Sequence, residues 1–231
     1  MAADAQINHA DARQYWQSIP ADVNGMLGGF PYISKVDLQG SRAFLVKLGV
    51  CGKGRKVERG VDCGAGIGRI TSGLLLHIAD VVDIVEPVAK FSNALIGVPG
   101  IGEIYTTGLE SWSPSRTPGY DLIWNQWCVG HLTDVQLVAY LRKCGEALRE
   151  GGFVVVKENL STDPGGEDVF DEVDSSVTRT DKKFRALFEE AGMKVKRTEI
   201  QNGLPSELYP VRIYGLQPAV KPTATEAAIE G

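Results

Sequence analysis

Three glycines in a short loop indicate a place where a nucleotide-like ligand meets the backbone. Gly64, Gly66 and Gly68 form a G-x-G-x-G pattern directly after an apolar segment. Glycine permits a tight turn and a close approach of backbone to ligand, and the first N–H groups of a following helix can point at the ligand. Glu86 follows about twenty residues later, where a carboxylate can accept hydrogen bonds from both hydroxyls of a ribose. These residues predict a nucleotide-like site; the alternative is a loop that only needs positive φ.

The glycine spacing favours a cofactor without phosphate groups. G-x-G-x-G is one residue tighter than the dinucleotide fingerprint G-x-G-x-x-G, and no lysine of a phosphate-binding loop follows Gly68. S-adenosylmethionine fits this pattern, because it joins an adenosine to a charged amino-acid end. Arg69 is placed to bind the carboxylate of that end; the alternative is a solvated arginine at the start of a helix.

A second group of aromatic and polar residues lies within and just after the segment 120–127: Trp124, Gln126, Trp127 and His131. Because the side chains of a strand alternate between its faces, Trp124 is expected in the core. Trp127 and His131 are expected to line a pocket. An imidazole has an unperturbed pKa of about 6.5, which suits a general base at neutral pH.

An acidic stretch follows the last of the central apolar segments. Residues 158–178 carry seven acidic residues and neither lysine nor arginine. Such a run is usually a solvated loop. Its position after a predicted strand, on the side of the sheet where ligands bind, instead predicts attraction of a cationic substrate.

The elements that must position these residues alternate between strand and helix. Apolar segments predict strands over 57–63, 81–86, 103–107, 120–127, 153–158, 193–200 and 211–216. Helices are predicted over 67–77, 88–95, 133–148 and 180–191. Such alternation requires crossover connections, and therefore predicts a doubly wound α/β fold with a mainly parallel sheet covered on both faces. Ligands of such sheets sit at the carboxyl ends of the strands.

A length of 231 residues favours one domain with additional segments attached to it. We expect this domain over 11–216, with a helical N-terminal block at 11–49, a core at 57–216 and an insertion at 160–178. Residues 1–10 and 217–231 lack periodicity and are predicted to be disordered tails.

Composition argues against several classes of protein. A net charge of −5 disfavours binding to nucleic acid. No apolar run reaches the ~20 residues that span a bilayer, and the N-terminus lacks a secretory signal, so no membrane partner is expected. The four cysteines form no C-x-x-C pair, so we expect reduced thiols and no metal site. A nucleophilic pair of Cys128 with His131 has poor geometry.

Longer sequence motifs narrow the class of protein further than the glycine loop does. They are YW at 15–16, GMLGG at 25–29, DCGAGIGRIT at 62–71, IWNQWCVGHLTD at 123–134, KEN at 157–159 and DEVDSSV at 171–177. With these blocks, spread over residues 15–216, the chain resembles the eukaryotic protein N-terminal methyltransferases. These class I enzymes use S-adenosylmethionine to methylate the α-amine of proteins that begin X-Pro-Lys or X-Pro-Arg once the initiator Met is removed. The resemblance implies a Rossmann-like sheet whose last strand is antiparallel, and S-adenosylhomocysteine as a product.

The resemblance also implies roles for individual residues. The cofactor would be held by Gly64, Gly66, Arg69, Glu86, Leu109, Glu110, Gln126 and Trp16. Residues 11–49 would form a lid over the cofactor, with Trp16 and Leu27 facing cofactor and substrate. The substrate would meet Trp127 at its proline ring, Asn159 at its first carbonyl, Asp171, Asp174 and Ser176 near its basic third residue, and Tyr209 where the channel closes. The catalytic set would be Asp174, His131 and Asn159.

Two departures from the family pattern concern the cofactor side. The family usually has Asp at the position of Glu86 and often Gln at the position of Glu110. A longer acid at Glu86 still accepts two ribose hydroxyls, whereas Glu110 loses the amide that would contact the adenine.

The expected chemistry needs a base. The α-amine of a peptide has a pKa of about 7.7–8.0 and must lose its proton before it attacks a methyl group. His131 and Asp174 are both candidate bases, and the sequence does not rank them.

Three alternatives stay open: a methyltransferase for another substrate, a non-catalytic adapter on the same fold, and, least favoured, an NAD-dependent oxidoreductase. The expected targets include ribosomal proteins, and the chain is expected to be a monomer in the cytoplasm or nucleus.

Overall fold

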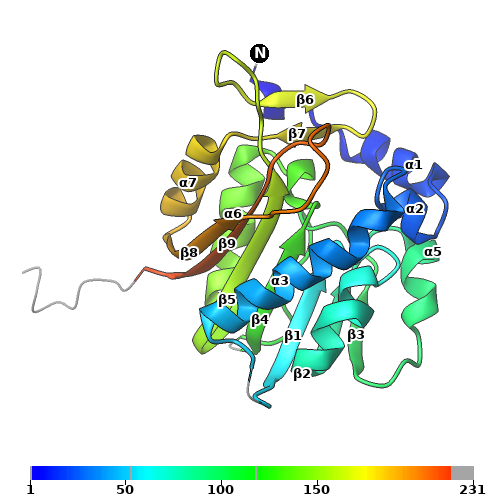
Figure 1. Cartoon of the computed structure of the whole chain (residues 1–231), viewed down its shortest axis with the longest axis vertical. Coiled ribbons are helices and arrows are strands. Elements are labelled where there is room, and N and C mark those ends of the chain that lie inside the picture. Colours follow the sequence, from blue (N-terminus) through cyan, green and yellow to red (C-terminus); the bar gives the residue numbers. More distant parts are fainter. Residues whose placement is uncertain (1, 53, 118, 220–231) are drawn as a thin grey trace, which may run out of the picture.

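In the computed structural model, which describes residues 2–52, 54–117 and 119–219, seven strands form a twisted sheet with helices on both faces (Figure 1). The strand order is β3-β2-β1-β4-β5-β9-β8. In chain order the strands of this sheet are β1 (Val57–Cys63), β2 (Ala79–Val85), β3 (Ile101–Tyr105), β4 (Tyr120–Gln126), β5 (Leu148–Asn159), β8 (Met193–Ile200) and β9 (Val211–Pro218). Two short strands, β6 (Val169–Asp171) and β7 (Ser176–Thr178), form a separate antiparallel pair.

The direction of the strands confirms the predicted doubly wound sheet. β1 runs parallel to β2 and β4, β2 to β3, and β4 to β5. The last strand, β9, is antiparallel to both β5 and β8. The carboxyl ends of parallel strands meet at one edge of a sheet. The segments that follow β1, β2, β4 and β5 therefore open onto the same end of the molecule, and these segments carry the predicted site.

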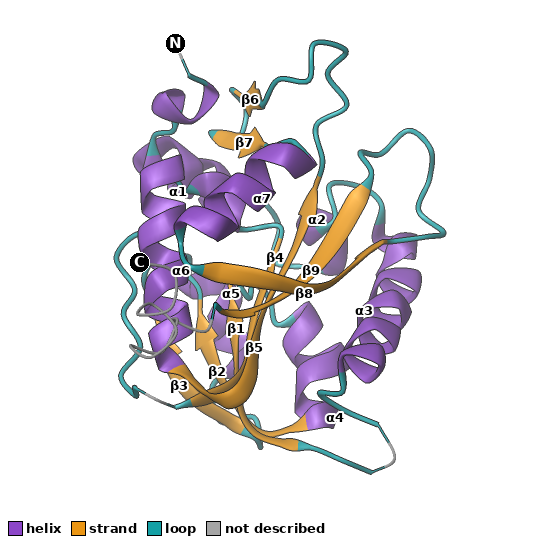
Figure 2. Cartoon of the chain, turned by 90° about the vertical axis from the view of Figure 1, so that its left-hand side faces the viewer, coloured by secondary structure: helices purple, strands orange, loops and turns teal. Residues whose placement is uncertain are grey.

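Two layers of helices enclose the sheet, as the edge-on view shows (Figure 2). One face is covered by α3 (Ser34–Leu48) and by the continuous helical segment made of η3 (Thr71–Leu75) and α4 (Leu76–Ile78). The other is covered by α6 (Asp134–Ala147) and α7 (Asp181–Glu190). Each face of the sheet has its own hydrophobic core. Trp124 of β4 packs with Phe44 of α3 in the core on the first face, whereas its neighbour Ile123 packs with Leu141 of α6 in the core on the other face. The prediction that Trp124 is a core residue is confirmed.

Local sequence determines where the helices begin. The Thr133 hydroxyl accepts a hydrogen bond from the backbone N–H of Gln136, whose side chain accepts one from Thr133 N–H, so a capping box starts α6. The helix predicted from Ile67 begins later, at Arg69. The reason is the glycine loop: Gly64, Gly66 and Gly68 have φ of 69°, 55° and 78°, so the chain turns before it can become helical.

The remaining helical segments are short, apart from α1 (His9–Ser18), which has 10 residues. They are η1 (Ala3–Gln6), α1 (His9–Ser18), α2 (Val23–Met26), η2 (Pro31–Ile33), α5 (Ala89–Ser92), η4 (Asn93–Leu95) and η5 (Val129–His131). The segments η1, α1 and α2 lie at the end of the molecule that carries β6 and β7 (Figure 1). Within the described ranges, no helix has the length and apolarity needed to cross a bilayer.

Both predicted tails need correction where the structure describes them. Residues 3–6 are helical, and the Asp4 carboxylate accepts a hydrogen bond from the backbone N–H of Asp134 at 3.0 Å. An acidic group is favoured there because the first N–H groups of a helix are otherwise unpaired. Asn8 N–H donates to the Ser175 hydroxyl at 2.8 Å, which ties the start of α1 to the segment before β7. At the other end β9 extends through Pro218, and residues 220–231 lie outside the described residues.

Candidate active site

Among the described residues, two neighbouring cavities open at the carboxyl end of the sheet. The first has about 1070 Å³ of empty space between the glycine loop, the turn after β2 and helix α1. The second has about 940 Å³ between the end of β5, β7 and the segment that precedes β9. The two cavities share four lining residues: Trp16, Met26, Trp127 and His131. A ligand in the first cavity can therefore face a ligand in the second.

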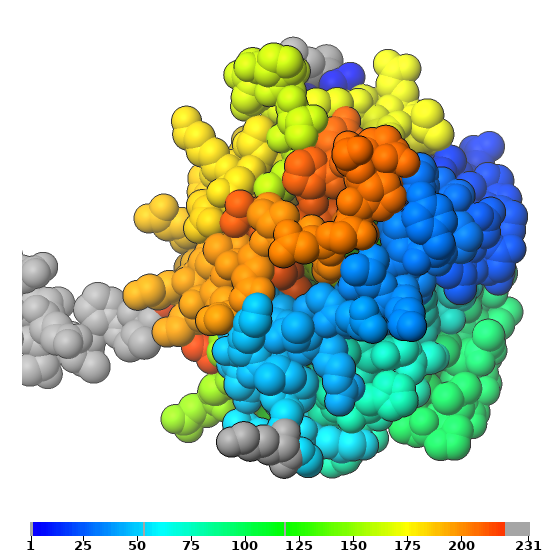
Figure 3. Space-filling view, in the orientation of Figure 1, coloured from blue at the N-terminus to red at the C-terminus, as the bar shows by residue number. Residues whose placement is uncertain are grey.

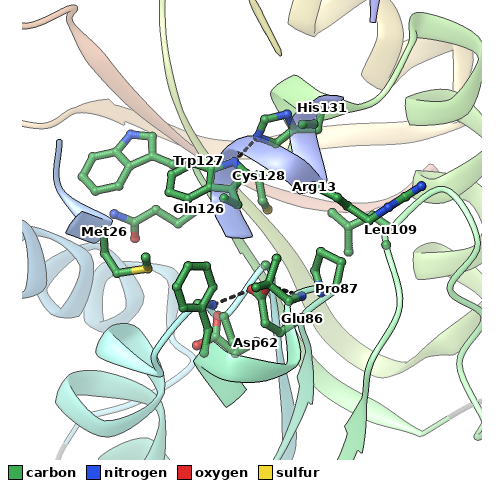
Figure 4. Close-up of a pocket in the computed structure, with 18 of the residues that line it drawn as sticks. Arg13, Met26, Asp62, Glu86, Pro87, Leu109, Gln126, Trp127, Cys128 and His131 are labelled. Carbon is green, nitrogen blue, oxygen red and sulfur yellow. Dashed lines mark hydrogen bonds between the residues drawn. The ribbon is translucent and has the colours of Figure 1, made fainter. Parts of the chain in front are cut away.

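The glycine loop forms the floor of the first cavity, and only glycine fits it. A Cβ on Gly64 would lie 2.4 Å from the Cβ of Cys128, and one on Gly66 would lie 2.7 Å from the Met26 sulfur. Glu86 stands beside the loop and lines the cavity (Figure 4). Its carboxylate accepts hydrogen bonds from the backbone N–H groups of Gly66 and Val88, both at 2.8 Å. Burial raises the pKa of Glu86, against the effect of these two hydrogen bonds.

Arg69 and Gln126 line the same cavity, and both are held by Asp37 of α3. Arg69 Nη1 donates to Asp37 Oδ2 at 2.7 Å, and Gln126 Nε2 donates to both carboxylate oxygens at 2.9 and 3.0 Å. The Arg69 guanidinium lies 5.5 Å from the centre of the Trp127 ring. The alternative of a solvated Arg69 is wrong, since its side chain is 9% exposed. Gln126 Oε1 is buried and accepts no hydrogen bond from the described part of the chain.

Helix α1 covers the first cavity as the predicted lid would. Trp16 Nε1 donates to His131 Nε2 at 3.1 Å, so the lid is joined to the turn after β4. Arg13 of the same helix forms an ion pair of 3.4 Å with Glu110, which lines the cavity with Leu109. The structure thus brings all the predicted cofactor residues to one cavity: Gly64, Gly66, Arg69, Glu86, Leu109, Glu110, Gln126 and Trp16.

The second cavity gathers most of the predicted substrate residues. Its lining includes Leu27, Trp127, Asn159, Asp174, Ser176 and Tyr209. Asp174 Oδ1 is buried, and no hydrogen bond reaches it from the residues that the structure describes. Tyr209 is 41% exposed. Among the described residues, the cavity therefore offers an unpaired carboxylate oxygen beside both apolar and polar side chains, the polar ones including Asn159, Ser176 and Thr178.

Asp171 is the predicted substrate residue that the structure does not bring to this cavity. It ends β6, is exposed, and accepts a hydrogen bond from the backbone N–H of Val173 at 2.8 Å. Neither cavity includes it among the described lining residues. A contact of Asp171 with substrate thus needs a ligand that extends beyond the second cavity, and its role stays a prediction.

A strained turn after β4 carries two of the four residues shared by the cavities, Trp127 and His131. Trp127 has φ of 53°, which is rare outside glycine and costs roughly 1 kcal/mol or more. The turn is held by Glu158 of β5, whose Oε1 accepts hydrogen bonds from the backbone N–H groups of Cys128 and Val129 at 2.8 and 2.9 Å. Sequence reasoning counted Glu158 among the acids of a loop. Its position in the KEN block, at the end of a central strand, is the signal that places it inside.

Burial changes the protonation of two groups near this turn. It lowers the pKa of His131, whose Nδ1 is buried without a partner among the described atoms, so the imidazole is neutral at pH 7. Burial also raises the pKa of Glu158 from 4.5 to about 7, although the hydrogen bonds from Val129 and Cys128 oppose this change.

The raised pKa of Glu158 predicts a pH-dependent effect of a Glu158→Gln substitution. Below pH 7 the folded state holds a proton that the unfolded chain releases above about pH 4.5, so the free energy of unfolding falls as the pH rises through this window. Glutamine does not titrate, and its amide oxygen can accept the same two hydrogen bonds. The stability of the variant relative to the wild type is therefore expected to increase by about 2–3 kcal/mol between pH 5 and pH 8. Urea unfolding of both proteins at the two pH values measures this difference, and an unchanged difference contradicts the buried carboxyl.

Comparison with known proteins gives one consistent match. The family described as AdoMet-dependent proline di-methyltransferase matches residues 4–217. Alpha N-terminal protein methyltransferase 1 of Schizosaccharomyces pombe is 44% identical over 223 residues, which cover 93% of this chain and 98% of the relative. N-terminal Xaa-Pro-Lys N-methyltransferase 1 of Xenopus tropicalis is 38% identical over 216 residues, covering 90% and 95%.

A solved structure is similar over most of the chain. It is a SAM-dependent methyltransferase from Leishmania major, with 34% identity and a TM-score of 0.82. The match covers 90% of this chain and 82% of that one.

Proposed function

The chain belongs to the AdoMet-dependent proline di-methyltransferase family, and we propose that it methylates the α-amine of proteins that begin X-Pro-Lys or X-Pro-Arg after the initiator Met has been removed. The observation that carries this proposal is the junction of the two cavities. One cavity has the glycine loop and an acid for a nucleoside, and the other has an unpaired carboxylate. Trp127 and His131 stand where the two cavities meet.

The first cavity fits S-adenosylmethionine by the chemistry of its lining. Glu86 offers a carboxylate to the ribose hydroxyls, and Arg69 offers a guanidinium to the carboxylate of the amino-acid end. Gln126 Oε1 is an acceptor without a partner among the described residues, which suits the ammonium group of that end. The glycine loop leaves room for the ligand close to the backbone. When bound, S-adenosylmethionine supplies a methyl group on a positively charged sulfur.

The second cavity fits the first residues of a polypeptide. Trp127 offers an aromatic wall to a proline ring, and the Asn159 amide offers a hydrogen bond to the first carbonyl. Asp174 and Ser176 line the same space, and Asp171 lies on β6, the strand paired with β7. The acids of this region would attract a basic third residue.

Between the two candidate bases, the hydrogen bonds favour Asp174. The lone pair of His131 Nε2 already accepts the indole N–H of Trp16. Asp174 Oδ1 has no such partner in the described ranges, so it can accept the proton that the α-amine must lose. His131 then holds the lid and shapes the junction. No covalent intermediate is needed, because rate comes from aligning the amine with the methyl donor and excluding water.

A pair of peptides tests the proposal. Methyl transfer to a hexapeptide that begins Ser-Pro-Lys is compared with transfer to its N-acetylated twin, which keeps the lysine side chain and lacks the free α-amine. We expect methylation of the first peptide only, located at the α-nitrogen by fragment mass spectrometry. Transfer to neither peptide would favour another substrate or an adapter, and equal transfer to both would place the reaction on the lysine side chain.

The target proteins, the oligomeric state and the cellular location form part of the same proposal. Ribosomal proteins that begin X-Pro-Lys are the expected targets, met by a monomeric enzyme in the cytoplasm or nucleus. Analytical ultracentrifugation and fractionation of cells measure the last two properties.

A further inference from the structure

A buried ionic cluster lies behind the first cavity, built around Asp37 and Lys157. Both side chains are fully buried, and neither belongs to the described lining of either cavity. Lys157 Nζ contacts Asp37 Oδ1 at 2.5 Å, and Arg69 contacts Asp37 Oδ2 at 2.7 Å. Gln126 donates to both oxygens from the adjacent strand. The Asp37 carboxylate thus joins α3 to two side chains that face the cavity.

In the cluster two basic side chains, Lys157 and Arg69, contact the Asp37 carboxylate. The Lys157 amino group approaches three side-chain oxygens, of Asp37 at 2.5 Å, Gln201 at 2.8 Å and Ser41 at 2.9 Å, and the Asp37 carbonyl at 3.2 Å, so all three donors of the ammonium group have acceptors. Burial alone would raise the pKa of Asp37, but the charges of Lys157 and Arg69 lower it, so Asp37 is ionised. Burial lowers the pKa of Lys157, whereas its contact with the Asp37 carboxylate raises it, so each group favours the charged form of the other. Buried charges are expensive unless they are compensated, so the cluster is suited to receive one further anion.

The cluster is fixed from several sides. Gln201, in the segment between β8 and β9, binds Lys157 and also donates to the carbonyl of Val36. Gly40 allows this approach, since a Cβ there would lie 2.2 Å from Gln201 Oε1. In the space-filling view the segment after β8, in orange, lies against the blue N-terminal part of the chain (Figure 3). The Asp37 carboxylate is therefore held in one orientation. The side chains of Arg69 and Gln126, which it binds, are held with it.

We propose that Asp37 is a positioning residue: with Lys157 as its counter-ion, it holds Arg69 and Gln126 in place for the amino-acid end of S-adenosylmethionine. This inference rests on the proposed function. The carboxylate of the ligand is the anion that balances the surplus positive charge at Arg69. Gln126 uses its Nε2 on Asp37, which leaves the buried Oε1 without a donor among the described residues and able to accept from the ligand's ammonium group.

Two ligands distinguish positioning from a general effect on folding. S-adenosylhomocysteine has the amino-acid end, and 5′-methylthioadenosine has the same adenosine without it. An Asp37→Asn substitution is expected to raise the Kd of S-adenosylhomocysteine roughly ten- to a hundredfold, because charge-assisted hydrogen bonds that fix Arg69 are lost. The Kd of 5′-methylthioadenosine is expected to stay within about threefold, since Glu86 and the glycine loop are unchanged. Isothermal titration calorimetry measures both constants.

Two further variants complete the experiment. Asp37→Asn combined with Lys157→Met leaves no unpaired ammonium in the core and keeps the test valid if the single variant does not fold. Asp83→Asn is the matched control, because Asp83 is also fully buried and binds Arg59 with two hydrogen bonds of 2.9 and 2.8 Å, yet lines neither cavity in the described chain. We expect it to lower the unfolding temperature without changing the ratio of the two Kd values.

The outcomes separate this inference from the proposed function. If the wild-type protein does not bind S-adenosylhomocysteine, the proposed function fails. If the wild type binds it and the Asp37 variants weaken both ligands equally, or neither, the positioning role is overturned and Asp37 is structural only. A selective loss of S-adenosylhomocysteine supports the inference, whatever the variants do to turnover.

Discussion

An Asp174→Asn variant is expected to lose roughly 10²- to 10⁴-fold in kcat and to keep its affinity for S-adenosylhomocysteine within about threefold. Asparagine has almost the same shape as aspartate but cannot take a proton from the α-amine at neutral pH. Asp174 lines the second cavity and is absent from the described lining of the first, so the cofactor side keeps its contacts. The loss is therefore expected in turnover. Steady-state kinetics with a Ser-Pro-Lys peptide, together with calorimetry, measures both quantities.

The control for this variant is Glu172→Gln, two residues away. Glu172 is exposed and lines neither cavity in the described residues, so the same change of charge at this position is expected to leave kcat unaltered. A comparable loss in both variants would assign the effect to the summed acidic field of the region. Full activity of the Asp174 variant would return the role of base to His131, which then has to release the indole of Trp16.

Much of the fold and of the site could be predicted from the sequence because both depend on local patterns. Strands of apolar residues with glycine turns between them determine the doubly wound sheet, and its parallel strands bring Gly64, Glu86 and Trp127 to one edge. Glu86 was predicted from its distance along the chain to the glycine loop. The structure places its carboxylate 2.8 Å from Gly66 N.

The features that were missed depend on contacts between distant residues. Asp37 and Lys157 are separated by 120 residues: Asp37 lies in an N-terminal segment of mixed polarity, whereas Lys157 directly follows an apolar run over 153–156. The position of Lys157 in a predicted central strand indicates burial, but nothing in the local pattern of either segment indicates that the two residues pair. The N-terminal residues 3–8 were predicted to be a tail for the same reason, since their partners Asp134 and Ser175 lie far along the chain. The contact of Asp171 with substrate stays a prediction, because a matching motif does not fix the direction of a side chain at the end of a two-stranded hairpin.

A Trp127→Ala substitution is expected to raise the KM for an X-Pro-Lys peptide about a hundredfold and the Kd of S-adenosylhomocysteine by less than about tenfold. Trp127 lines both cavities, but the two sides depend on it differently. The first cavity keeps the polar contacts of Glu86, Arg69 and Gln126 when the ring is removed. In the second cavity the ring is the aromatic wall that would cover a proline, so its loss removes a large apolar contact area.

The backbone of the turn is expected to survive this change. Glu158 holds the N–H groups of Cys128 and Val129, and these bonds do not involve the indole. Alanine at position 127 keeps the positive φ, so the strain neither disappears nor grows greatly. A Trp127→Phe variant keeps a flat ring and is expected to bind peptide within about tenfold of the wild type. Equal losses of peptide and cofactor affinity in the alanine variant would contradict a proline-binding wall, because they would mean that Trp127 acts by shaping the junction for both ligands alike.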